Sequence, residues 1–512
     1  MGQAVKRAGA DWRALLEKSD QLEGYRVVLV SPAGEQGPSP QQYAPTEHLG
    51  LAYLAAVLRR RGAEVQIIDA YALGLSREEV LAETAAFGPH MVGFTSEYNT
   101  FDTAAWLASR VKASIPSATV CMGGEHVSFA AEEVMAQSPF VDFLVRGEGE
   151  CTIVEASTRL RRGETLESVA GCHYRDGDRV VRNPERPAIP DLDALPFPAR
   201  DTLHRCVRRG IKPAVAVLGS RGCHARCNFC NAHRFFSLGG GRPWRGRSPG
   251  NVVDELEAVL GSVPRGDIYA VVYFADENFV GPGRVGVRRA VAIAEEMIRR
   301  RLSVPFEIFC RADSFDGEEG AVETLVRAGL CSALVGLESG SDTRLHAMSK
   351  GTTVQQNLRT VELFAKHGVV TSSSGFLMFH PYSTLAELKE NARFLLSIRQ
   401  ATLYNMSLRL LMYPGIEMVG QLEVDGLLLP GRSHTAVGAY RFKDAAVGRL
   451  AAALGELDEG LVRKEDAAHR YMDLSLTRFR RAAPHLFAEG APPAAARALA
   501  RVESLRFRAN LV

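Results

Sequence analysis

Residues 220–231, SRGCHARCNFCN, place three of the chain's nine cysteines, Cys223, Cys227 and Cys230, within one short loop. A disulfide needs two thiols and a closed zinc site needs four ligands, whereas a [4Fe–4S] cube held by three thiolates leaves one iron open. The C-x3-C-x2-C spacing, with no second cysteine pair at zinc-ribbon spacing, favours the iron–sulfur cluster. His224 or His233 could supply a fourth zinc ligand, so a zinc site stays as the alternative.

The bulk composition describes an ordinary globular protein of more than one domain. A chain of 512 residues exceeds what one core normally supports. Its 46% hydrophobic and 23% charged residues are average, and a net charge of +2 gives no reason to expect nucleic acid or an anionic membrane as partner. No apolar run is long enough for a membrane span, and the N-terminus lacks a signal-peptide core. We therefore expect a cytoplasmic protein with reduced thiols.

The first part of the chain alternates β-rich and helical stretches. The expected strands are residues 25–32, 63–70, 90–99, 118–127 and 141–150, and the expected helices are 48–62, 76–88 and 101–116. This alternation predicts an α/β fold with an open, doubly wound parallel sheet, whose ligands bind at the carboxyl ends of the strands. Two of those ends are glycine-rich, which lets backbone approach a ligand closely. They carry Gly123, Gly124, Glu125 and His126, and then Gly147 and Glu148. A simpler explanation is that these glycines only make tight turns.

A second alternating region follows a hairpin with a turn at Asp176-Gly177 and a Pro-rich linker. Its expected strands are residues 214–218, 269–275, 306–310, 333–338, 371–379 and 406–412. Six such units predict a full or partial (β/α) barrel, with the cysteine loop directly after its first strand. The region beyond is expected to be helical. The predicted division is residues 1–24 as an N-terminal extension, 25–165 as the first domain, 166–212 as hairpin and linker, 213–415 as the barrel, and 416–512 as a C-terminal helical domain.

The three cysteines after the first barrel strand resemble the radical S-adenosylmethionine (SAM) superfamily. The resemblance implies a [4Fe–4S] cluster whose open iron chelates the amino and carboxylate groups of SAM. An electron from the cluster then cleaves the sulfonium, and the resulting 5′-deoxyadenosyl radical abstracts hydrogen from an unactivated carbon. It further implies that strand ends contact SAM: Asp276, Glu277 and Asn278 the ammonium, Arg311 the carboxylate, Gly336 and Glu338 the ribose, and Tyr413 the adenine. Taken singly, each charged residue could instead form an ion pair at the barrel rim.

The first domain, in turn, is similar to the cobalamin-binding domain that precedes the barrel in one large branch of this superfamily. The segments HLGLAYLAAVLRRRGAEVQIIDA, MVGFTSEYNT, CMGGEHVSF and VDFLVRGEGE carry this similarity, and with the barrel it covers residues 25–415. The D-x-H-x-x-G signature of other cobalamin proteins is absent, as is usual in this branch. The lower face of cobalt is therefore left without a named ligand.

Three classes of function remain. The resemblance favours cobalamin-dependent C-methylation of a small, natural-product-like molecule, with a flavodoxin or ferredoxin as electron donor. The alternative is a radical SAM reaction without methylation, such as diol dehydration, epimerisation, cyclisation or decarboxylation, in which the first domain does not use cobalamin. Such chemistry needs a proton donor or acceptor, and the ionisable candidates at predicted loop ends are Glu47, His48, Glu97, Tyr98 and His380. The third class is a zinc-binding scaffold protein. Nothing in the sequence indicates the oligomeric state.

Overall fold

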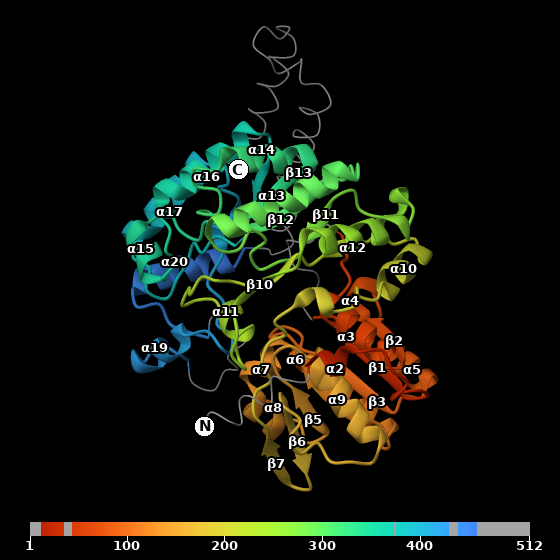
Figure 1. Ribbon diagram of the computed structural model, residues 1–512. Helices are drawn as coiled ribbons and strands as arrows, with labels where there is room; N and C mark the ends of the chain where they lie inside the picture. Colours follow the sequence, from red (N-terminus) through yellow and green to blue (C-terminus); the bar gives the residue numbers. More distant parts are fainter. Residues whose placement is uncertain (1–11, 35–43, 373–374, 430–438, 458–512) are drawn as a thin grey trace. The chain divides into compact units, whose positions relative to one another are not determined.

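The computed structural model describes residues 12–34, 44–372, 375–429 and 439–457. These residues form two compact units (Figure 1). The first unit takes its residues from 1–224, 231–270 and 413–415, and the second takes its residues from 225–230, 271–412 and 416–512. The five-part division expected from the sequence stays a prediction. Within the described residues, no helix combines the length and the apolar character needed to cross a membrane.

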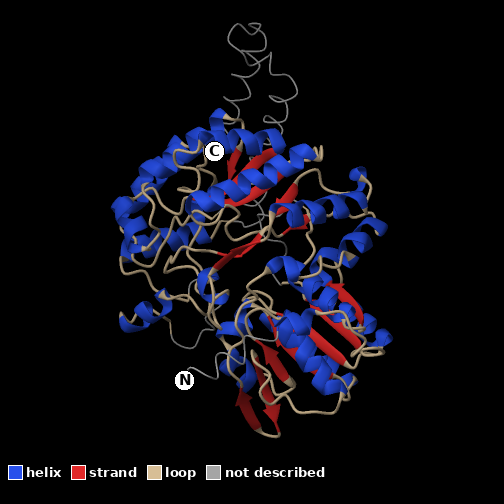
Figure 2. Cartoon of the chain, in the orientation of Figure 1, coloured by secondary structure: helices blue, strands red, loops and turns tan. Residues whose placement is uncertain are grey.

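A seven-stranded sheet forms the centre of the first unit, with the order β2-β1-β3-β4-β5-β6-β7. The strands are β1 (Arg26–Ser31), β2 (Glu64–Asp69), β3 (Met91–Thr95), β4 (Thr119–Gly123), β5 (Phe143–Val145), β6 (Cys172–Asp176) and β7 (Arg179–Arg182). The first five pair in parallel, which confirms the predicted doubly wound sheet. The predicted hairpin is present as β6 and β7, and it extends this sheet with antiparallel pairing (Figure 2).

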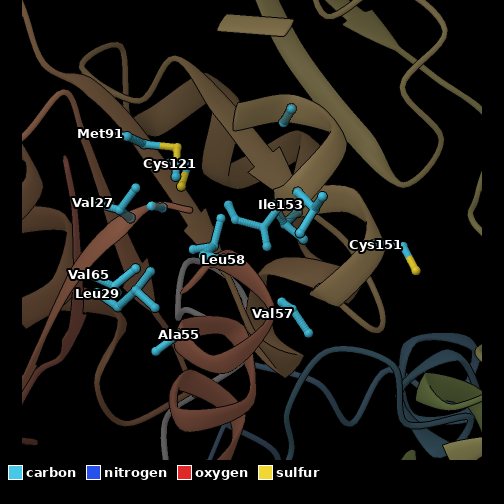
Figure 3. Packing of buried hydrophobic residues seen from close by; sticks show 14 of the residues in the cluster. Val27, Leu29, Ala55, Val57, Leu58, Val65, Met91, Cys121, Cys151 and Ile153 are labelled. Carbon is cyan, nitrogen blue, oxygen red and sulfur yellow. The ribbon is translucent and has the colours of Figure 1, made fainter. Parts of the chain in front are cut away.

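Both faces of the parallel strands are buried, because helices cover each side. Val27 and Leu29 of β1 belong to one core, while Val28 and Val30 belong to the other. The helices are α2 (Trp12–Leu16), α3 (Leu49–Arg60), α4 (Ala70–Leu73), α5 (Arg77–Phe87), α6 (Phe101–Ser114), α7 (Glu125–Phe129), α8 (Ala131–Gln137) and α9 (Glu150–Arg161). Figure 3 shows the first core, in which Leu58 of α3 and Ile153 of α9 pack with β1 side chains. Continuous apolar strands are typical of parallel sheets covered on both sides.

The strands predicted at residues 90–99, 118–127 and 141–150 are too long, since β3 ends at Thr95, β4 at Gly123 and β5 at Val145. Residues 118–127 were expected to be extended, but β4 ends at Gly123 and α7 begins at Glu125. Gly124 between them has a φ of +102°, a conformation that residues with a Cβ rarely adopt. The chain therefore turns at the carboxyl edge of the sheet and presents backbone there.

The rest of the first unit consists of short elements. They are the 3₁₀ turns η1 (Leu192–Ala194) and η2 (Arg265–Asp267), α10 (Asp201–Arg208), β8 (Ala216–Val217), β9 (Ser220–Gly222), α11 (Ala232–Phe235), β10 (Trp244–Gly246) and α12 (Pro249–Gly261). Strands β9 and β10 form an antiparallel ribbon. The cysteine loop leaves this ribbon directly after Gly222, whose φ is +82°. A Cβ at Gly222 would lie 2.0 Å from the carbonyl oxygen of Pro243, so only glycine fits there.

The second unit contains the repeated β/α pattern predicted for the barrel. Strands β11 (Val272–Phe274), β12 (Phe306–Arg311), β13 (Leu330–Gly336) and β14 (Val370–Ser372) are parallel neighbours in that order. The helices between and after them are α13 (Gly283–Arg299), α14 (Glu319–Ala328), α15 (Asp342–Ala347), α16 (Val354–Lys366) and α17 (Leu385–Ser397). This arrangement is that of a partial (β/α) barrel, and it confirms the predicted fold class.

The end of the barrel differs from the prediction. Among the described residues of 371–379, the structure has only the end of the short β14 and a single bridge from Phe379 to Arg409. The strand expected at residues 406–412 is replaced at its start by α18 (Leu403–Ser407). The Thr402 side chain accepts a hydrogen bond from the Asn405 backbone, which starts that helix. Helices α19 (Met418–Val424) and α20 (Ala445–Gly455) agree with the expected helical C-terminal region. Residues 458–512 of that region, and residues 1–11, lie outside the described residues.

A buried network of arginines and glutamates ties the first sheet to the ribbon and to α12, all within the first unit. Arg200 pairs with both Glu47 and Glu255, and Arg247 also pairs with Glu255. Arg221 pairs with Glu148 at 3.0 Å and Glu150 at 2.5 Å, and Arg245 pairs with Glu148 at 2.8 Å. All eight side chains are less than one tenth exposed. Because each charge has a partner, the cost of burying it is offset.

We predict that Arg200→Met destabilises the first unit by about 3–5 kcal/mol, because it leaves the carboxylates of Glu47 and Glu255 buried with fewer counter-charges. The free energy of unfolding, measured by urea denaturation of the apoprotein, reports the change.

Arg299→Met is the matched control, since the Arg299–Glu296 pair on α13 has an arginine side chain that is 68% exposed. It should cost no more than about 1 kcal/mol. Equal losses of unfolding free energy in Arg200→Met and Arg299→Met would show that burial does not make the loss of an ion-pair partner more costly.

Candidate functional site

The cysteine loop connects β9 to α11. Cys227 is buried, while Cys223 and Cys230 are partly exposed. Within the second unit, the Cys230 backbone donates a hydrogen bond to the Cys227 carbonyl at 3.2 Å, and Asn228 between them donates two more. Its backbone N–H reaches the carbonyl of Met348 at 3.2 Å, and its side-chain amide reaches the carbonyl of Ala347 at 2.9 Å. The cysteine loop is thus bound by the backbone carbonyls of Ala347 and Met348, a contact that the sequence did not predict.

Arg311 at the end of β12 faces the loop. Its Nη1 lies 4.0 Å from Cys227 Sγ, and its Nε and Nη2 donate to the Asp313 carboxylate at 2.9 and 3.0 Å. Nη2 also donates to the Lys350 carbonyl at 2.8 Å. A guanidinium beside a cysteine sulfur favours the thiolate, which is the form that binds iron. Three thiols in one loop with this cation beside them fit an iron–sulfur cluster.

Glu338 and Gly336 lie together at the end of β13. The Glu338 carboxylate accepts a hydrogen bond from Lys350 Nζ at 2.8 Å, and both side chains are buried. Glu338 has a φ of +61°, which is unusual for a residue with a side chain. A Cβ at Gly336 would lie 2.7 Å from Lys350 Nζ and 2.8 Å from Glu338 Oε1, so a larger residue there would displace the ends of these two side chains. Lys350, in the segment SKGTT, was not predicted, because no motif marks it.

The residues expected to follow β11 do not share one environment. Asp276 and Asn278 are fully buried, whereas Glu277 is exposed. The Asn278 side chain accepts a hydrogen bond from the Gly281 backbone at 3.4 Å. The sequence predicted one shared role for the three residues, but only Asp276 and Asn278 share a buried environment.

In the first unit, the ends of β3 and β4 meet. The Ser96 N–H donates to the Gly123 carbonyl at 2.8 Å, and the His126 N–H donates to the Ser96 carbonyl at 3.3 Å. A Cβ at Gly124 would lie 2.6 Å from the Ser96 carbonyl oxygen. Glu125 begins α7, and the His126 ring packs against the ring of Phe101 at 4.7 Å between centroids. This bare backbone edge fits a large planar ligand such as a corrinoid.

The second glycine-rich strand end, at Gly147 and Glu148, differs from the first because its acidic side chain is paired. The Gly147 N–H donates to Ser128 Oγ at 2.9 Å, but the Glu148 carboxylate is taken up by Arg221, Arg245 and the Ile189 N–H. Burial acts to raise the pKa of Glu148, but the two arginines and the Ile189 N–H outweigh it, so its pKa is lowered. Glu148 is therefore an ionised member of the buried network.

The four ionisable candidates of the first unit also differ from one another. Glu47 is paired with Arg200, and burial raises its pKa against the effect of that arginine. The His48 Nδ1 accepts a hydrogen bond from the Leu51 N–H at 3.1 Å and caps α3, while its Nε2 lies 3.4 Å from Thr95 Oγ1. Glu97 binds Thr100 through its backbone. Glu47 and His48 therefore have structural contacts that explain their positions.

Tyr98 and Tyr413, far apart in the sequence, stack in the first unit with ring centroids 5.7 Å apart. Sequence reasoning assigned them to different tasks, Tyr98 to proton transfer and Tyr413 to adenine contact. Burial raises the pKa of the Tyr98 hydroxyl, with a further contribution from Glu97, so this hydroxyl is a poor acid at neutral pH. The stack is an apolar surface with two hydroxyls.

His380 belongs to the second unit and is almost fully buried. Its Nδ1 lies 3.3 Å from Arg344 Nη1, and its Nε2 has no hydrogen-bond partner among the described residues. Burial, and then the charge of Arg344, lower the pKa of His380 to about 3. The imidazole is therefore neutral at physiological pH.

Comparisons with known proteins identify the two domains that contain most of these residues. A model of the B12 binding domain matches residues 43–157, and a model of the radical SAM superfamily matches residues 217–395. An uncharacterized methyltransferase, PH0819, of Pyrococcus horikoshii is 30% identical over 72% of this chain and 77% of its own length. An anaerobic magnesium-protoporphyrin IX monomethyl ester cyclase of Rubrivivax gelatinosus is 29% identical over 63% of this chain, which spans only 57% of that protein.

A solved structure gives the same picture of the fold. The cobalamin-dependent SAM radical enzyme OxsB, with aqua-cobalamin and SAM bound, matches with a TM-score of 0.72 and 21% identity, over 94% of this chain and 75% of that chain. The radical SAM domain implies a [4Fe–4S] cluster and SAM, and the B12 binding domain implies cobalamin. The protein is an enzyme, and the chain belongs to the radical SAM superfamily, in the branch with an N-terminal cobalamin-binding domain.

Proposed function

We propose that this enzyme is a cobalamin-dependent C-methyltransferase acting on an unactivated carbon of a small molecule. The observation that carries the proposal is the glycine-lined edge at Ser96, Gly123 and Gly124, in a chain that also carries the three-cysteine loop. The relative from Pyrococcus horikoshii, named as a methyltransferase, supports it. When bound, the cluster supplies the electron that cleaves SAM, and the corrinoid supplies the methyl group.

The proposed roles of the chain's own residues follow from the contacts above. Cys223, Cys227 and Cys230 hold the cluster, and Arg311 keeps the Cys227 sulfur next to a positive charge. Glu338, with Gly336 beside it, orients the ribose, and Asp276 or Asn278 supplies a polar group after β11. Glu277 stays a candidate for the SAM ammonium, as Tyr413 does for the adenine. We also propose a flavodoxin or ferredoxin as electron donor and a cytoplasmic location.

For the corrinoid side we propose that Gly123, Gly124, Glu125, His126 and Gly147 line the binding edge. Their backbone lies at the carboxyl ends of β4 and β5, where ligands of doubly wound sheets bind. Glu148 is better explained as a structural residue, since its carboxylate is fully engaged.

A second candidate function is a radical reaction without methyl transfer. The similarity to the Rubrivivax gelatinosus cyclase favours it, since that relative is named for ring formation. In this case His380 is the candidate for proton transfer: its Nδ1 accepts from the Tyr382 N–H, so its Nε2, without a partner among the described residues, carries the hydrogen. Glu47, His48, Glu97 and Tyr98 are the weaker candidates for the reasons given above.

The central test is the content and turnover of the anaerobically reconstituted protein. We expect about four irons and near-stoichiometric corrinoid after mixing with hydroxocobalamin and desalting, and 5′-deoxyadenosine from SAM when a reductant is added. Four irons with SAM cleavage but no retained corrinoid would reject methyl transfer and favour the second candidate. Zinc without sulfide would reject both.

Gly124→Ala tests the corrinoid edge. The added Cβ would approach the Ser96 carbonyl to 2.6 Å at a φ of +102°, so the loop must shift. We expect corrinoid retention to fall at least tenfold in a spectrophotometric titration, while iron content stays at the wild-type level. Gly320→Ala, at an exposed glycine of α14 with open space around it, is the matched control and should leave both values unchanged.

His380 should make the second unit acid-labile. The unfolded state takes up a proton below its ordinary pKa of about 6.5, but the folded state does not do so until the pKa of about 3. Stability is therefore lost as the pH falls below 6.5, by about 2 kcal/mol at pH 5. In His380→Asn, the loss of unfolding free energy between pH 7 and pH 5 should be smaller than in the wild type by about 2 kcal/mol. His346→Asn, at an exposed position, should show the same loss as the wild type.

A further inference from the structure

A segment of four residues, which lies beyond the end of β13 and far from the cysteines in sequence, contacts the cysteine loop. Residues 347–350, called here the latch segment, offer two carbonyls to Asn228, which lies between Cys227 and Cys230. A third carbonyl, that of Lys350, accepts a hydrogen bond from Arg311 at 2.8 Å. All of these groups belong to the second unit.

The latch segment is itself fixed by local geometry. The Lys350 N–H donates to the Leu345 carbonyl at 3.0 Å. Ser349 has a φ of +52° and Gly351 a φ of +71°, so the chain reverses sharply on both sides of Lys350. The Lys350 side chain, between these two turns, points to Glu338.

Lys350 brings a buried positive charge to the site. Its ammonium is 2.8 Å from Glu338 Oε1, and the residue is 5% exposed. Burial acts to lower the pKa of Lys350, but the negative charges of Glu338 and then of Cys227 outweigh it, so its pKa is raised. Arg311 connects the latch segment to the cysteine loop, because its Nη2 donates to the Lys350 carbonyl at 2.8 Å while its Nη1 lies 4.0 Å from Cys227 Sγ.

We propose that Lys350 is a positioning residue that fixes Glu338 and raises the reduction potential of the cluster held by Cys227. The inference rests on the proposed cluster site. On reduction the cluster gains one electron from an external one-electron donor and thus one negative charge, while Lys350 keeps its proton. A cation at close range in a buried site stabilises that added charge.

The test is a potentiometric titration of the reconstituted protein, followed by the electron paramagnetic resonance signal of the reduced cluster. In Lys350→Met the ratio of reduced to oxidised cluster at a fixed potential should fall about tenfold, a shift of about 59 mV to more negative values. Lys350→Arg keeps the charge and should restore the wild-type midpoint. Lys366→Met, which removes an exposed lysine of α16, is the control and should have no effect.

Lys350→Met also leaves Glu338 buried without its partner, so this variant could fail to take up iron. The double variant Lys350→Met/Glu338→Gln removes both buried charges and keeps the measurement possible. It should bind four irons and show a midpoint more negative than that of the single variant Glu338→Gln, which differs from it only in the charge at residue 350. A wild-type midpoint in Lys350→Met, or equal midpoints in the double variant and Glu338→Gln, with the cluster intact, overturns the proposal.

Different experimental results would refute the proposed function and the proposed role of Lys350. Wild-type protein that binds no four-iron cluster refutes both. Wild-type protein that cleaves SAM, beside a Lys350→Met variant with unchanged midpoint, refutes only the role of Lys350.

Discussion

The buried pairing of four arginines with four glutamates is the constraint on which the first unit depends. Arg200 and Arg247 share Glu255, and Arg221 and Arg245 share Glu148. Each guanidinium presents several donors in a rigid plane, so one arginine can satisfy two carboxylates at once. The glutamates come from the first sheet region and from α12, whereas the arginines come from the linker and the β9–β10 ribbon. Ion pairing therefore fixes how the cysteine loop leaves the sheet region.

Much of the fold could be predicted from the sequence, because local patterns determined it. The alternation of apolar strands and capped helices identified the parallel sheet, and the three-cysteine spacing identified the cluster loop. The last barrel strands could not be predicted, since residues 376–379 and 410–412 are apolar, yet the described residues of both segments pair through only one bridge outside β14. The turn at Gly124 was missed for a similar reason: CMGGEHV reads as extended until tertiary contacts bend it.

The candidate site was predictable only where a motif named its residues. Arg311 lies beside Cys227 and pairs in register with Gly336, and Glu338 binds Lys350, but Lys350 was not predicted because a lysine between a serine and a glycine has no distinctive pattern. Glu47 and Glu148 show the opposite error. They stand at loop ends where ligand-binding acids are expected, yet buried arginines occupy both, and no local feature of the sequence shows which distant arginine will pair with which acid.

The positive φ of Glu338 has a consequence for how this protein can change. A glycine at that position would relieve backbone strain of about 1–3 kcal/mol, but it would leave the Lys350 ammonium buried without its carboxylate, which costs about 3–5 kcal/mol. The carbonyl oxygen of the same strained residue accepts a hydrogen bond from the Leu377 N–H at 2.9 Å, and its side chain accepts one from Lys350. The ion pair with Lys350 therefore outweighs the strain of the Glu338 backbone, and the two positions can change only together.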